Sequence, residues 1–252
     1  MTGKYFRFSD VLSYGWNVMK TCLGFFVGVG IVWILAIYAT TIIELVLRHT
    51  IYTESFPSAL KIFMAIANWV IGIIIGIGII KIALSFCDEQ KPAFSTLFNA
   101  SWNCFWRYLA AGILYMLIFI AGLILLIAPG VIWSVQFGLW PYFVVDKGLG
   151  PIQALKASSR TTMGVKWDLF GFGILCAIFN LAGLLCLIVG VFVTYPTIIV
   201  AHALVYRQLA AQTPELAEFG INQTPTEYAQ TDITLPPDDS SANPGGGYFR
   251  DR

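Results

Sequence analysis

Two stretches of the chain, residues 108–145 and 169–206, contain no Asp, Glu, Lys or Arg, and each is 38 residues long. A continuous helix of that length would reach roughly 57 Å, about twice the hydrocarbon thickness of a bilayer. Each stretch therefore predicts two membrane spans joined by a tight turn. Turn residues lie near the middle of each, at Pro129-Gly130 and at Gly190.

Two further apolar runs precede them. The run Thr21–Ile43 is longer than the apolar region of a signal peptide and is not followed by a small-x-small cleavage pattern, so we expect it to remain as the first span. The run Ile62–Ile80 lies between two lysines and predicts the second span. The six expected spans are at about 22–45, 60–86, 107–128, 130–147, 167–189 and 190–210.

Composition supports this pattern. The chain has 252 residues, of which 58% are hydrophobic and 12% charged, whereas soluble domains carry about 25% charged residues. The fold class predicted is all-α, a polytopic membrane protein with a six-helix domain over residues 1–210. Residues 211–252 are acidic, rich in Thr, Pro and Gly, and without a periodic apolar face, so they predict a disordered cytoplasmic tail. Its aromatic tip, Gly245–Arg250, is either a docking motif or an inert end.

Basic residues indicate the orientation. If both termini are cytoplasmic, eleven Lys and Arg residues of the membrane domain, residues 1–210, fall on the cytoplasmic side and only Arg48 and Lys61 on the other. Lys and Arg concentrate on the cytoplasmic side of membrane proteins, so both termini are predicted to be cytoplasmic.

The chain also contains an internal repeat. Phe8-Ser9 matches Phe94-Ser95 and Trp16-Asn17 matches Trp102-Asn103, both at an offset of 86 residues, and a weaker third copy runs over 152–158. Each copy precedes a pair of predicted spans. The pattern therefore predicts three units, each a short helix followed by a transmembrane hairpin.

Apolar residues recur at helical spacing in each short segment. Their stripes predict amphipathic helices at the cytoplasmic interface, or helices that pack against the protein's own bundle. In the third segment, Pro151 is at a plausible first helical position, and Lys156 and Arg160 share a face. The basic set Lys147, Lys156, Arg160 and Lys166 is interpreted either as a contact for lipid head groups or as ordinary determinants of topology.

Small and kinking residues occur within the spans. The patterns Gly24-x-x-x-Gly28 and Gly72-x-x-x-Gly76 permit close helix packing, within the chain or between copies. Pro141 and Pro196 are expected to kink their spans.

One segment resembles a known family. It reads Pro129-Gly130-Val131-Ile132, then Pro141–Asp146, then Gly150–Ser158, then Gly164. This resembles the YciC-like bacterial six-span inner-membrane proteins and is similar to the membrane domain of some glycerophosphoryl diester phosphodiesterases. The resemblance covers about residues 5–210 and implies a multi-pass protein of the bacterial cytoplasmic (inner) membrane. It implies no activity, since those phosphodiesterases carry their chemistry in a separate soluble barrel.

No catalytic or metal-binding pattern is visible in the sequence. The two histidines and five cysteines are scattered, and the cysteines are expected to be small buried hydrophobes without a disulfide. No enzyme activity, catalytic residue, metal or cofactor is therefore predicted.

Polar residues within the spans are the remaining candidates. Polar residues in the predicted outer halves of the spans are interpreted in one of two ways. They form a polar vestibule open to the outside, or they make hydrogen bonds between helices. His202 is either a proton relay or a structural histidine. The set is Glu44, Asn68, Gln136, Asn180 and His202.

These patterns favour a non-enzymatic role, in organising the membrane or interacting with lipid, as an oligomer or as an accessory subunit of a membrane complex. The expected partners are membrane lipids and a second copy or another membrane protein, with no nucleic acid. The alternative is a small-solute or lipid transporter or channel that uses the polar outer-half residues.

Overall fold

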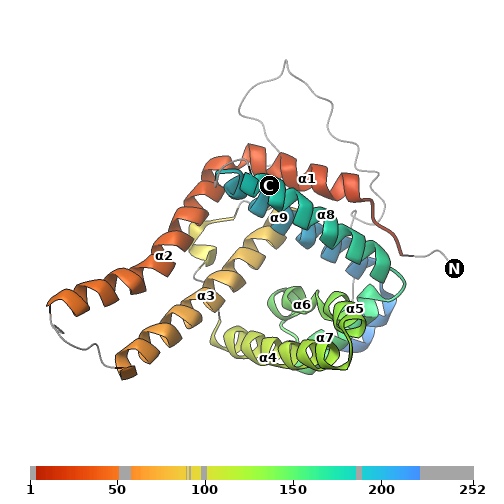
Figure 1. The fold of residues 1–252 in the computed structure, drawn as a ribbon. Coiled ribbons are helices and arrows are strands. Elements are labelled where there is room, and N and C mark those ends of the chain that lie inside the picture. Colours follow the sequence, from red (N-terminus) through yellow and green to blue (C-terminus); the bar gives the residue numbers. More distant parts are fainter. Residues whose placement is uncertain are drawn as a thin grey trace, which may run out of the picture.

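The computed structural model describes residues 4–50, 58–88, 90, 92–97, 101–185 and 189–221. All regular structure in these ranges is helical, and Figure 1 shows its arrangement. The elements are α1 (Phe8–Thr21), α2 (Leu23–Thr50), α3 (Ser58–Cys87), η1 (Phe94–Leu97), α4 (Trp102–Leu125), α5 (Ile127–Phe137), α6 (Trp140–Lys147), α7 (Pro151–Thr162), α8 (Lys166–Leu185), α9 (Val189–Ala211) and η2 (Pro214–Phe219). The prediction of an all-α protein is confirmed.

Among the described residues, three helices are long and apolar enough to cross a membrane, not six. They are Ala59–Cys87 in α3, α4 and α8. A fourth candidate is the pair formed by α1 and the first part of α2, which are bent by 85° at Cys22. The predicted six-span count is therefore wrong for this part of the chain.

The predicted span at 130–147 is not one helix. It is divided between α5, of 11 residues, and α6, of 8 residues. Pro141 lies in the first turn of α6, where its missing N–H costs nothing, so it begins a helix instead of kinking a span. Segments this short are typical of helices buried within a protein or re-entrant at a membrane surface.

The predicted span at 190–210 is the central helix of the fold. Most residues of its second half are buried, and it packs against α1, α3 and α8 (Figure 1). Hydropathy alone could not show that this helix is surrounded by protein, because protein and lipid surroundings both favour apolar side chains. The fully buried residues of α9 include Val200, Ala201, Ala203 and Leu209.

The predicted tight turn near Pro129-Gly130 is present, whereas the residues that join α8 to α9, 186–188, lie outside the described residues. Helix α4 ends at Leu125 and α5 starts at Ile127, with the extended residue Leu126 between them. Helices α4 and α5 then pack so closely that a Cβ on Gly130 would lie 3.1 Å from the Leu123 backbone nitrogen. Near the junction of α8 and α9, a Cβ on Gly190 would collide with the Gly183 carbonyl, so glycine is needed for the approach of the two helices.

The predicted three-unit repeat is reproduced only in part. Helices α1 and α7 are short amphipathic helices that precede longer ones, and Pro151 begins α7 as expected. The middle copy differs, because η1 ends at Leu97 and Trp102 already starts α4. The apolar faces of α1 and α7 are buried against other helices, which supports the alternative of packing within the protein. The buried residues of α1 are Val11, Gly15, Val18 and Met19.

The predicted packing glycines behave differently from one another. A Cβ on Gly24, Gly72 or Gly76 would meet nothing within 4 Å, whereas one on Gly28 would lie 2.8 Å from the Phe94 ring. Of these four glycines, only Gly28 therefore permits a close contact within the described part of the chain.

The predicted tail begins too early. Beyond α9, the short helix η2 packs back onto α7, with Leu216 fully buried and Glu218 paired to Arg160 at 3.0 Å. The ordered body thus extends to Ile221, because this segment contributes apolar residues to the core. The remainder of the predicted tail, residues 222–252, lies outside the described residues.

Candidate functional site

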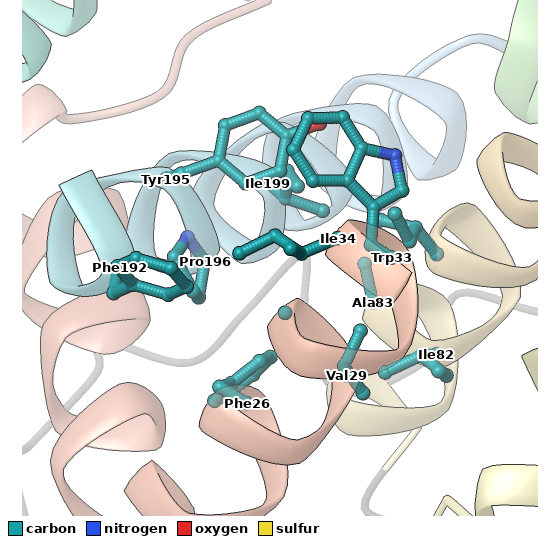
Figure 2. A pocket seen from close by; sticks show the side chains of 12 residues that line it. Phe26, Val29, Trp33, Ile34, Ile82, Ala83, Phe192, Tyr195, Pro196 and Ile199 are labelled. Atoms are coloured by element: carbon teal, nitrogen blue, oxygen red, sulfur yellow. The ribbon is translucent and has the colours of Figure 1, made fainter. Parts of the chain in front are cut away.

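Helices α2, α3 and α9 surround an apolar cavity of about 340 Å³. Figure 2 shows that side chains from all three helices converge on it. Among the described residues, no charged side chain lines the cavity, and only the phenol of Tyr195 and the indole of Trp33 provide polar side-chain atoms. The lining residues are Phe26, Val29, Gly30, Trp33, Ile34, Ile79, Ile82, Ala83, Phe192, Tyr195, Pro196 and Ile199.

The cavity has a buried floor and an accessible rim. Ile82 and Ala83 are only 2% and 1% exposed. In contrast, Trp33 is 41% and Tyr195 45% exposed. The cavity therefore opens to the surroundings beside two aromatic side chains with polar tips, which is the kind of residue enriched at membrane interfaces.

Two backbone features shape the cavity wall. Gly30 allows α2 to approach α9, since a Cβ there would lie 3.0 Å from the Phe192 ring. Pro196 lies inside α9, as predicted, and has no N–H to donate to the Phe192 carbonyl four residues earlier. The sequence analysis did not identify this cavity, because its lining residues are ordinary span residues whose meeting depends on the helix arrangement.

A polar cluster fixes the junction of α5, α6 and α7. The Gln136 amide donates to the Ser159 hydroxyl at 2.6 Å, and Lys166 Nζ donates to Gln136 Oε1 at 2.7 Å. The Gln136 carbonyl also accepts bonds from the hydroxyls of Ser158 and Thr162. Gln136 thus lies beside α7 and the start of α8. Its predicted place in the outer half of a span is wrong, because α5 ends at Phe137 instead of continuing into a span.

A second cluster joins the ends of α3, α6 and α9. Arg207 donates to Asp146 at 2.9 Å and to Asp88 at 2.6 Å. Tyr206 and Lys147 also contact Asp146, at 2.8 Å and 3.1 Å. Burial raises the pKa of the Asp88 carboxyl, while the neighbouring Arg207 acts in the opposite direction. The cluster was not predicted, although Asp88 lies two residues beyond the predicted span at 60–86 and Asp146 lies next to the last residue of the predicted span at 130–147.

The other intramembrane polar candidates lie apart from Gln136. Asn180 accepts a hydrogen bond from Thr194 at 3.1 Å, which links α8 to α9. His202 Nδ1 is 2.9 Å from the Ile198 carbonyl of its own helix, and its ring packs on Phe172. These contacts fit the interpretation of both residues as structural.

Asn68 and Glu44 belong to the α2–α3 hairpin. Asn68 is half-buried in the first half of α3. Glu44 is in α2, but its side chain lies outside the described part of the structure, so its proposed role stays a prediction.

The four predicted head-group residues have different surroundings. Lys147 pairs with Asp146, Arg160 with Glu218, and Lys166 binds Gln136. Lys156 is exposed on α7. Three of the four therefore make contacts within the protein, of which those of Lys147 and Arg160 are ion pairs.

The described cysteines and histidines form no metal centre. Cys87 and Cys176 are buried, as expected for small hydrophobes, and Cys22 and Cys104 are partly buried. Within the described ranges, no group of three His, Cys, Asp or Glu side chains is placed to hold a metal ion. Cys186 lies outside these ranges.

Comparisons with protein-family models, curated proteins and solved structures gave no match to this chain. The resemblance carried by Pro129–Gly164 therefore stays a prediction.

Proposed function

We propose that this chain is a non-enzymatic, polytopic protein of the bacterial inner membrane that interacts with lipid. The observation that carries the proposal is the outward face of α4. Its large apolar side chains are exposed along most of the helix. Contact of this apolar surface with water would cost a free energy of about 25 cal/mol per Å². They include Ile113, Met116, Leu117, Leu123 and Ile124.

The ends of the described chain support the proposed orientation. The Tyr5 backbone and the Gln212 side chain exchange two hydrogen bonds, each of 3.0 Å. The start of α1 and the end of α9 therefore lie on the same side of the molecule. This agrees with both termini being cytoplasmic, where the basic residues predict them to be.

The charged groups near the helix ends support a non-enzymatic role. Arg207 pairs with both Asp88 and Asp146, and Lys166 binds the Gln136 amide oxygen. These side chains connect helices through ion pairs and hydrogen bonds. They contact one another and do not point into a shared cleft.

The proposal is tested by fractionating cells that express the chain and washing the membranes with alkaline carbonate. The protein should stay with the membrane pellet, and native mass spectrometry of protein extracted in its own lipids should show retained lipid. Release into the wash would overturn membrane embedding. A lipid-free protein whose unfolding temperature rises with a specific solute would instead favour the transporter.

A further inference from the structure

We propose that the cavity between α2, α3 and α9 binds one acyl chain of a membrane lipid. This proposal rests on the proposed membrane location and specifies the site at which lipid is held. The occupant follows from the described lining, which offers an apolar ligand dispersion contacts from three helices and offers a charged ligand no ionic partner.

The size of the cavity favours a chain over water. At about 340 Å³ it is at the lower end of the range for small-molecule sites and far larger than the space one water needs. Water inside would find few hydrogen-bond partners, because the floor is made of side chains such as Ile82 and Ala83. A flexible hydrocarbon chain fills such a space without any polar requirement.

The position of the cavity favours lipid as the source of that chain. One wall belongs to the apolar helix Ala59–Cys87, which is long enough to cross a bilayer and would bring the cavity mouth into contact with hydrocarbon.

The rim provides a place for the polar end of the chain. Trp33 and Tyr195 flank the opening from α2 and α9, and Figure 2 shows both rings beside it. An indole N–H and a phenol O–H both donate hydrogen bonds, and ester carbonyls of a glycerolipid accept them. The rim would therefore hold the ester region while the chain extends to the floor.

The test uses the full-length protein in vesicles of phosphatidylethanolamine and phosphatidylglycerol that contain a phosphatidylcholine with a diazirine at the end of one acyl chain. After illumination, adducts are located by mass spectrometry. Peptides that line the cavity should be labelled severalfold more than peptides from the exposed face of α4, which serve as the internal reference.

Matched variants locate the binding. Ala83→Phe fills the floor and should reduce cavity labelling severalfold while α4 labelling stays constant. Ala65→Phe makes the same change on the exposed surface of α3 and should leave both signals unchanged. Ile34→Trp fills the cavity from α2 and takes the place of Ala83→Phe if that variant does not fold.

The outcomes separate this proposal from the proposed function. Two results would overturn the acyl-chain site and leave the membrane location intact. One is labelling of α4 with no excess at the cavity, and the other is cavity labelling that persists in both filling variants. Absence of labelling on α4 as well would overturn both.

Discussion

Asp146 and Arg207 form an ion pair with an N–O distance of 2.9 Å, although 61 positions separate them in the chain. Each is the first charged residue after one of the two 38-residue charge-free stretches. Their side chains are only 12% and 15% exposed. The ends of α6 and α9 are therefore held together by charges that the sequence shows only as boundaries of apolar segments.

Removing Arg207 should destabilise the protein strongly. Arg207→Met would leave Asp88 and Asp146 partly buried without their main counter-charge, which costs about 3 kcal/mol of unfolding free energy for a buried pair. The measurement is reversible unfolding in detergent micelles. As a control, Arg7→Met removes an exposed pair with Asp10 at 3.6 Å and should cost less than about 1 kcal/mol. Equal losses in both variants would show that the cluster does not hold the helix ends together.

Gln136 should be needed for stability more than for any transport pathway. Gln136→Leu removes the side-chain partner of Ser159 and of Lys166 Nζ, so we expect a loss of about 1–3 kcal/mol. Gln153→Leu is the matched control, since its side chain accepts only one backbone bond in the structure, from Gly150, and should cost less. A fully stable Gln136→Leu protein that lost a solute-dependent response would favour the vestibule instead.

The contact between Asn180 and Thr194 should be a modest link between α8 and α9. A double-mutant cycle with Asn180→Leu and Thr194→Val should give a coupling energy of about 0.6 kcal/mol, typical of hydrogen bonds between membrane helices. Thermal unfolding of the four proteins provides the measurement. A coupling near zero would mean that the 3.1 Å contact contributes nothing to packing.

Gly15 should be required for the packing of α1 on α9. A Cβ on Gly15 would collide with the Thr197 carbonyl oxygen, which belongs to the backbone of α9 and cannot rotate away. Gly15→Ala should therefore destabilise the protein by about 1–3 kcal/mol.

The control for this prediction is Gly24→Ala, which introduces the same methyl group into open space near the start of α2. It should be neutral or stabilising by up to about 1 kcal/mol, because alanine is the better helix former. Unfolding of the two variants under identical conditions compares them directly. If Gly15→Ala were as stable as Gly24→Ala, α1 would be able to move away from α9 without cost.

Local features of this protein could be predicted from the sequence because each depends on a few neighbouring residues. The hairpin turn near Pro129-Gly130, the start of α7 at Pro151 and the apolar helices α3, α4 and α8 all follow from turn chemistry, helix capping or long runs without charge. The all-α class follows in the same way.

Only the tertiary structure shows which apolar segments are buried among other helices and which are divided into shorter helices. Hydropathy measures how strongly a segment avoids water, and a helix surrounded by protein satisfies that preference as well as one surrounded by lipid. Helix α9 is therefore central in the described fold, and residues 130–147 divide into α5 and α6. The cavity beside Trp33 and the pairing of Arg207 with Asp88 and Asp146 likewise depend on contacts between distant segments, which no local pattern records.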